Sequence, residues 1–224
     1  MRFGFEFLLT VAILIASSIS HGYSYDVRQR DVKLPSQVVM EKQTVTAPEA
    51  ADDDQVLTSN AGPTSAAALT ISTGLTAPDV PRNLSLLPGG TTDDVAGCTV
   101  VVSGTDFYGA AITENFVVAA SAATATAGAK AFKSVSSIYF PANCEAGGFA
   151  ASWKLGVGEK LGLKRCLASA GHVVFATLNG VYEGTRPTVA ANATAISGNT
   201  IDLNSSLDGN DVEAFFVQNY RCAP

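Results

Sequence analysis

The chain has 224 residues, of which 47% are hydrophobic and only 15% charged, with a formal net charge of −6. The acidic balance, with no basic run longer than Lys164-Arg165, argues against direct nucleic-acid binding, which needs Lys and Arg to replace phosphate counterions. So low a share of charge is typical of a surface that partner proteins cover, and equally of a plain Gly/Ala/Thr-rich β-sandwich.

The first 24 residues form a hydrophobic leader. Its apolar run from Phe7 to Ile19 has the length of a signal-peptide core and is shorter than the roughly 20 residues that a membrane span needs. Glu6 and the lack of an Ala-x-Ala cleavage site depart from the signal-peptide pattern. Two interpretations stay open: a secretory signal, or a start assigned too early, with the protein beginning near Tyr25 or Met40.

Residues 25–62 resemble an arm more than a domain. Charges of alternating sign follow Tyr25, two prolines interrupt any helix, and residues 49–54 form an acidic patch. Asn60-Ala61-Gly62-Pro63 closes the segment with turn residues. The pattern predicts an extended arm that is disordered or ordered only against a neighbour.

From residue 63 to 168, strand signals recur between turns. The expected strands are residues 67–72, 82–86, 98–103, 111–118, 132–140, 153–157 and 160–163. The turn at 104–109 makes 98–118 a hairpin, because Gly109 accepts positive φ and Asp106 can accept hydrogen bonds from local amides. Residues 119–129 are expected to be a loop. Residues 130–140 carry bulky apolar groups on both faces, which predicts cover on both sides by a second sheet or a partner.

After residue 168 the strand pattern starts again. Residues 173–178 and 181–183 flank Asn179-Gly180, the strongest short hairpin signal, and further strands are expected at 188–190, 200–203 and 212–217. Many short strands with Gly, Pro and Asn turns predict an all-β fold, a sandwich or barrel of antiparallel strands. Two lobes, 63–168 and 169–224, are expected to follow the arm.

Four segments between residues 77 and 163 resemble, in their order and spacing, the sequence pattern of a known group of proteins. They are residues 79–84 (DVPRNL), 101–114 (VVSGTDFYGAAITE), 129–135 (AKAFKSV) and 156–163 (GVGEKLGL). In order and spacing they resemble tailed-bacteriophage virion proteins of the capsid decoration or auxiliary structural kind. The resemblance implies a β-rich accessory protein on an icosahedral shell or on the tail, with the major capsid protein or other virion proteins as partners. Capsid lattices offer threefold sites, so a homotrimer is expected.

Catalytic motifs are missing from the sequence. His172 is the one histidine beyond the leader, which holds His21, and at a strand start it is expected to be a turn or surface residue. The carboxylate pairs Asp106/Glu114 and Asp93/Asp94 have nothing that singles them out. Asp208-Gly209-Asn210-Asp211 lacks the register of a calcium loop and predicts a turn. We therefore expect no enzyme, no cofactor or metal site and no small-molecule substrate.

The four cysteines leave the cellular compartment open. Cys98, Cys144, Cys166 and Cys222 lack the C-x-x-C spacing of zinc sites. In a secreted protein they allow two disulfides with three connectivities, whereas in the cytosol free buried thiols are expected. The leading hypothesis is a virion structural protein. The alternatives are a secreted or cell-surface β-sandwich for binding or adhesion and, less favoured, a secreted hydrolase with an unrecognised carboxylate pair.

Overall fold

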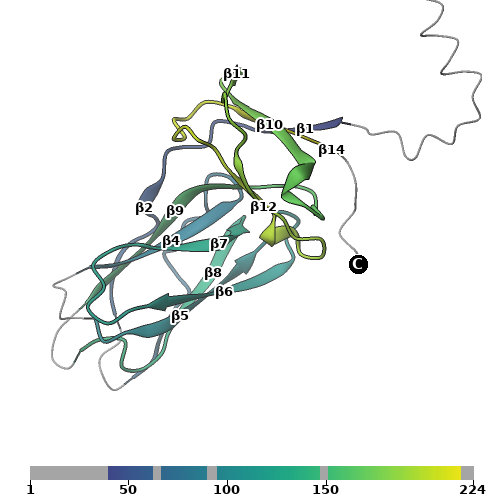
Figure 1. Ribbon diagram of the computed structural model, residues 1–224. Helices are drawn as coiled ribbons and strands as arrows, with labels where there is room; N and C mark the ends of the chain where they lie inside the picture. The colour runs from purple at the N-terminus through teal and green to yellow at the C-terminus, as the bar shows by residue number, and fades with distance from the viewer. Residues whose placement is uncertain (1–39, 63–66, 90–94, 147–150, 218–224) are drawn as a thin grey trace, which may run out of the picture. The chain divides into compact units, whose positions relative to one another are not determined.

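The computed structural model describes residues 40–62, 67–89, 95–146 and 151–217, all within the compact unit Val38–Pro224. Strands dominate these residues and form three antiparallel sheets, with two short 3-10 turns, η2 (Ala170–His172) and η3 (Ile196–Gly198), between them (Figure 1). The all-β prediction is confirmed. The predicted leader, 1–24, and arm residues 25–39 lie outside the described residues.

Two of the sheets form a sandwich. Sheet 3 has the order β3-β8-β5-β6, with β3 (Leu69–Ile71), β5 (Cys98–Thr105), β6 (Ala111–Val118) and β8 (Ser134–Phe140). Sheet 2 runs β12-β13-β9-β4-β7, and β2 also pairs with β9. Its members are β2 (Asp52–Ala61), β4 (Arg82–Gly89), β7 (Thr126–Phe132), β9 (Ser152–Gly162), β12 (Thr188–Ala190) and β13 (Thr200–Asp202).

The main hydrophobic core lies between the inward faces of sheets 2 and 3. It includes Leu84, Val100, Phe116, Ile138 and Trp153, each at most 1% exposed. Along β5 and β6, buried residues alternate with accessible ones, which is the periodicity expected of strands covered on one face. Burial of these large side chains is the chief source of stability here, because apolar area removed from water contributes about 25 cal/mol per Å².

Sheet 1 encloses a second core. Its order is β1-β14-β10-β11, with β1 (Met40–Val45), β10 (Val173–Leu178), β11 (Val181–Tyr182) and β14 (Val212–Val217). The predicted Asn179-Gly180 hairpin is confirmed: φ is +52° and +73° at these two residues, as a type I′ turn requires. The core beneath the sheet includes Leu161, Val173, Ala214 and Phe216.

The arm prediction is wrong for its described part. Residues 40–45 form β1, which pairs with β14 from Met40↔Val217 to Val45↔Val212, and β2 pairs with β9. The partners lie more than 90 residues away along the chain, so local composition gave no sign of them. The predicted lobe boundary at residue 168 also fails to separate the two cores, because Val45, Leu161, Leu163 and Leu167 belong to the second one.

Two strand predictions and one loop prediction need correction. Residues 130–140 are not one strand: β7 ends at Phe132 in sheet 2 and β8 begins at Ser134 in sheet 3, and the Lys133 amide between them donates to Thr105 O at 2.8 Å. Because of this crossing, Phe132 and Ile138 enter one core from opposite sheets. Part of the predicted loop 119–129 belongs to β7, and the two strands expected at 153–163 form one strand, β9.

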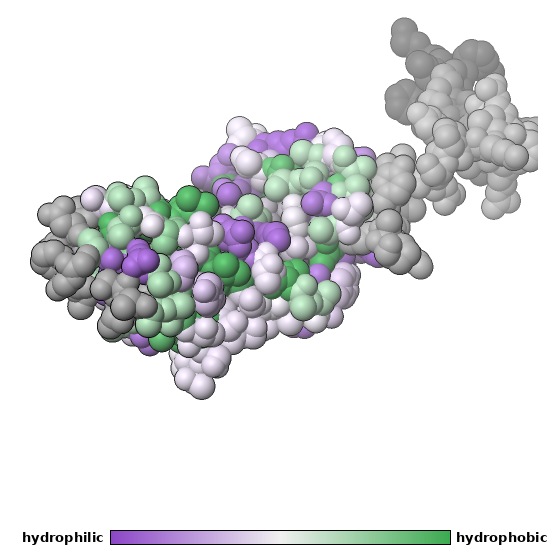
Figure 2. Space-filling view, turned by 90° about the horizontal axis from the view of Figure 1, so that it is seen from below, coloured by the Kyte–Doolittle hydropathy of each residue, from purple (hydrophilic) through white to green (hydrophobic). Residues whose placement is uncertain are grey.

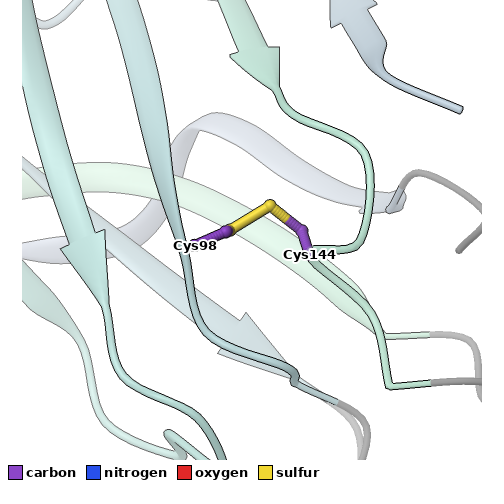
Figure 3. Close-up of a disulfide and its surroundings, with 2 residues drawn as sticks. All are labelled: Cys98 and Cys144. Carbon is purple, nitrogen blue, oxygen red and sulfur yellow. A yellow bond between two sulfur atoms is a disulfide. The ribbon is translucent and has the colours of Figure 1, made fainter.

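A disulfide joins the start of β5 to the segment after β8. Cys98 Sγ and Cys144 Sγ are bonded across 46 residues of sequence, and Cys144 is fully buried (Figure 3). Cys166 is also disulfide-bonded, so no cysteine among the described residues is a free thiol. No helix in this part of the chain is long and apolar enough to cross a membrane.

Candidate interaction surface

The DVPRNL segment supplies a buried cation that ties three parts of the fold together. Arg82, at 0% exposure, donates from Nε to Gly158 O (2.8 Å) and from Nη1 to Glu49 O (2.9 Å). Its Nη1 also lies 3.1 Å from Asp79 Oδ1, and the second oxygen of Asp79 accepts from the Glu49 amide at 2.8 Å. A buried charge needs such pairing, so Arg82 and Asp79 hold the β1–β2 connection against β4 and β9.

Asn83, next along β4, fills a gap in the ladder to β9. Its Nδ2 donates to Gly128 O at 3.1 Å and its Oδ1 accepts from the Lys160 amide at 2.9 Å. A Cβ on Gly158 would lie 2.6 Å from both Asn83 side-chain polar atoms, so any other residue there would have to displace the Asn83 amide. The pairing of β4 with β9 shifts register between Arg82 and Leu84, which is where the Asn83 side chain enters.

Hydrogen bonds link the GVGEKLGL segment to β1, to the β1–β2 connection and to the segment before β14. Glu159 accepts from the Ala51 amide at 3.0 Å and from the Leu207 amide at 2.8 Å. Gln43, buried on β1, donates to Gly162 O at 2.9 Å. Two of the segments that carry the resemblance, 79–84 and 156–163, therefore supply buried hydrogen bonds that hold distant parts of the fold together. Their role is structural.

The catalytic candidates from the sequence are not brought together into one site. Asp106 lies in the β5–β6 turn, where its Oδ1 accepts from the Tyr108 and Ala110 amides, each at 3.0 Å, as the turn prediction required. Glu114 lies on β6 and accepts from the Ala129 and Lys130 amides at 2.6 and 3.2 Å. His172 ends η2. Asp93 and Asp94 lie outside the described residues.

The Asp208–Asp211 segment is a turn, as predicted. Asp208 Oδ1 accepts from the Asn210 amide at 3.2 Å, Gly209 has φ of +82°, and Asp211 Oδ1 accepts from the Ala47 amide at 2.9 Å. Among the described residues, no group of three or more His, Cys, Asp or Glu side chains could hold a metal ion.

The outer face of sheet 3 carries no charged residue and is open to solvent. The side chains that point away from the core come in cross-strand rows, such as Thr70–Tyr139–Val101–Asn115. Two large apolar groups stand on it: Val117 is 71% exposed and Tyr139 42% exposed. The set includes Thr70, Thr99, Val101, Ser103, Thr105, Ala111, Thr113, Asn115, Val117, Ser134, Ser137 and Tyr139. Figure 2, seen from the side where β5 and β6 lie in Figure 1, shows mostly pale and green residues with smaller purple areas.

The edge of sheet 3 at β6 is held by side chains. The Glu114 carboxylate spans from β6 to the amides of Ala129 and Lys130 in β7, and Lys130 Nζ donates back to Thr113 O at 2.6 Å. Charged groups at a strand edge hinder the addition of a foreign strand. The flat outer face of sheet 3, and not this edge, is therefore the available surface.

Sheet 1 presents a different outer face. Phe175 and Phe215 stack with ring centroids 4.3 Å apart, and Tyr182 meets Phe175 edge-on at 5.9 Å. The ion pair between Lys42 Nζ and Glu213 Oε1, at 2.7 Å, lies among these rings. This face combines apolar and charged groups, so its desolvation costs more than that of the uncharged face on sheet 3.

Two carboxyl groups near the second core have shifted pKa values. Burial raises the pKa of Glu41, but hydrogen bonds from Arg165 and Lys164 outweigh it, so that pKa lies below its ordinary value. Burial raises the pKa of Asp202, with Lys160 opposing and Glu159 adding to the shift. Glu41 lies on β1 and Asp202 on β13.

No protein-family model, curated protein or solved structure matches this chain. The candidate surface therefore rests on the residues themselves. Sequence reasoning missed both the Arg82 network and the uncharged face. The sequence sign of the Arg82 ion pair was Asp79, three positions before the arginine. The sequence sign of the uncharged face was the recurrence of Ser, Thr and Val at alternate positions of β5 and β6.

Proposed function

We propose that this chain is a virion structural protein, a decoration or cement protein that binds a phage head through the outer face of sheet 3. The observation that carries the proposal is the complete lack of charge on that face beside the exposed Val117 and Tyr139 side chains. Depletion of charge with a few aromatic and apolar anchors is the composition of the centre of a protein–protein interface.

The physical argument concerns the cost of removing water. Backbone groups inside a sheet are already hydrogen-bonded to neighbouring strands, so covering the face desolvates only hydroxyls, one amide and apolar groups. One copy bound through this face alone would have modest affinity. A repeating shell raises the apparent affinity, because several linked copies bind at once. A homotrimer on a threefold position of the shell, contacting the major capsid protein, is the assembly that we propose.

The resemblance supports the same function. Its segments supply the Arg82 and Asn83 networks, which are internal to the fold and leave the outward residues free to match a particular shell. We also propose that the chain is not an enzyme, because the carboxylates of Asp106 and Glu114 are engaged by backbone amides at separate places.

A secreted or cell-surface binding protein is the second candidate, and the disulfides favour it. Cys98–Cys144 and the disulfide of Cys166 need an oxidising compartment. Virus particles also meet that condition after release from the cell, so the disulfides suit both candidates. The leader separates them, because only a secreted protein loses it during export.

The first test follows the native protein during infection. Particles of the encoding virus are banded on a density gradient, and the chain is detected by antibody and by mass spectrometry of its N-terminus. We expect it to band with the particles. A chain cleaved near residue 24 and found free in the medium, away from particles, would establish the secreted alternative.

A charge on the outer face of sheet 3 should block binding. Val117→Lys places an ammonium group at the proposed interface, and we expect at least a tenfold loss of affinity, about 1.4 kcal/mol, because the charge must be desolvated without a partner. The measurement is co-sedimentation of purified protein with particles that lack the gene for this chain.

Val181→Lys is the matched control. Val181 is a valine of similar exposure, 67% against 71%, but it lies on β11 in sheet 1. This variant should bind like the wild type, and both variants should keep the wild-type melting temperature. Equal binding by Val117→Lys and wild type would show that sheet 3 does not meet the particle.

A further inference from the structure

Cys166 is disulfide-bonded, and its partner is not among the described residues. The chain has four cysteines, of which Cys98 and Cys144 are bonded to each other. The cysteine that then remains is Cys222, which lies outside the described residues. Of the three connectivities that four cysteines allow, the observed pair therefore leaves one, with Cys166 joined to Cys222.

The surroundings of Cys166 favour a partner from the same chain. Cys166 is 2% exposed, and the next residue, Leu167, belongs to the second core. On one side the Lys164 amide donates to Gln43 Oε1 at 2.8 Å. On the other side the Leu167 amide donates to Asn199 Oδ1 at 2.9 Å. A sulfur so enclosed, on a backbone held at both sides, is shielded from the cysteines of a second molecule.

The end of β14 lies near Cys166. In the β1–β14 ladder Phe216 is opposite Glu41. The Glu41 carboxylate pairs at 3.1 Å with Arg165, the residue before Cys166. One strand pairing and one ion pair thus connect Phe216 to the neighbour of Cys166. Cys222 comes six positions after Phe216, and six residues of extended chain span up to about 20 Å, so the chain is long enough to return to Cys166.

We propose that a Cys166–Cys222 disulfide fastens the last strand of the chain into sheet 1. The bond closes residues 166–222 into a ring that contains β10, β11, β12, β13 and β14. β14 lies between β1 and β10 and contributes buried side chains to the second core. Segments near a chain end usually open first. The ring removes the free end from which β14 could separate from its two neighbours.

The chemistry is an ordinary two-electron oxidation. The Cys166 and Cys222 sulfur atoms form one bond and release two protons and two electrons. A disulfide oxidant such as glutathione disulfide takes these up and is reduced to two thiols. Each core then has its own covalent link, because Cys98 and Cys144 pack with the first core. This cross-link does not depend on the function proposed above.

A peptide map of the wild-type chain tests the connectivity. The protein is purified in air with glutathione disulfide, its thiols are blocked with iodoacetamide, and it is denatured and digested with trypsin without reduction. Cleavage after Arg165 and Arg221 separates residues 166–221 from the tripeptide 222–224, since the Arg186-Pro187 bond resists trypsin. We expect these two peptides to be joined, and to separate on reduction.

The other disulfide gives a different product in the same digest, because it joins residues 83–130 to residues 134–154. It serves as the internal control for complete digestion and for the absence of disulfide exchange. The proposal is overturned if Cys166 carries the blocking group, or if the tripeptide 222–224 is joined to a second copy of itself or to any peptide other than 166–221.

Cys222→Ser tests what the bond does. Amide hydrogen exchange along β14 should become about tenfold faster or more, because the strand regains a free end, whereas β5 and β6 should exchange as in the wild type. The matched control is the variant Cys98→Ala with Cys144→Ala, which removes the other disulfide and should accelerate β5 and β6 more than β14. Equal exchange of β14 in Cys222→Ser and wild type would show that the bond does not hold this strand. If Cys222→Ser does not fold, the wild-type peptide map decides alone.

Discussion

Arg82→Ala is expected to lower the free energy of unfolding by about 3–5 kcal/mol, the range seen when one partner of a buried ion pair is removed. The substitution leaves the Asp79 carboxylate and the carbonyls of Glu49 and Gly158 without the cation that pairs them. It also leaves a cavity where a side chain of 0% exposure was packed. Because the network joins the β1–β2 connection to β4 and β9, we expect both cores to lose stability together. Urea denaturation followed by Trp153 fluorescence measures the effect.

Lys42→Ala is the control for Arg82. It also removes a cation from an ion pair, but Lys42 is 50% exposed and its partner Glu213 27%. Exposed pairs contribute about 0–1 kcal/mol, so the denaturation midpoint should hardly move. If Arg82→Ala were no more destabilising than this control, the Arg82 network would not hold the fold together.

Removal of the Cys98–Cys144 disulfide is expected to cost about 2–4 kcal/mol. The bond closes 46 residues of chain that contain β5, β6, β7 and β8, and such a loop restricts the unfolded state by about 4 kcal/mol in the chain-entropy model. Cys98→Ala with Cys144→Ala in one variant removes this bond alone and places no polar group at the fully buried Cys144 position. The measurement is the urea midpoint of the double variant against the wild type.

A reducing agent offers an independent comparison. It breaks the disulfide of Cys166 as well, so the wild type in dithiothreitol should be at least as unstable as the double variant. If the free energy of unfolding of the double variant fell by less than about 1 kcal/mol, packing between sheets 2 and 3 would account for nearly all the stability of this region, and the disulfide would add little.

Local sequence was sufficient for the hairpins and for the class of fold. The β5–β6 hairpin keeps unbroken register from Cys98↔Val118 to Thr105↔Ala111, and its turn uses Asp106 and Gly109 as expected. Asn179-Gly180 likewise gives the predicted turn between β10 and β11. These features depend on alternation along a few residues and on the φ values that a turn needs, both of which are written in contiguous sequence.

Only the tertiary structure decided which distant segments pair. β1 has the composition of an arm and becomes a strand because β14, more than 160 residues later, supplies its hydrogen-bonding partners. The change of sheet at Lys133 follows from packing Phe132 and Ile138 into one core, and Arg82 becomes a buried cation only where Gly158, Glu49 and Asp79 converge. The open face on sheet 3 has the same origin. Alternation predicts two faces for each strand, but which one a second sheet covers is settled by long-range contacts.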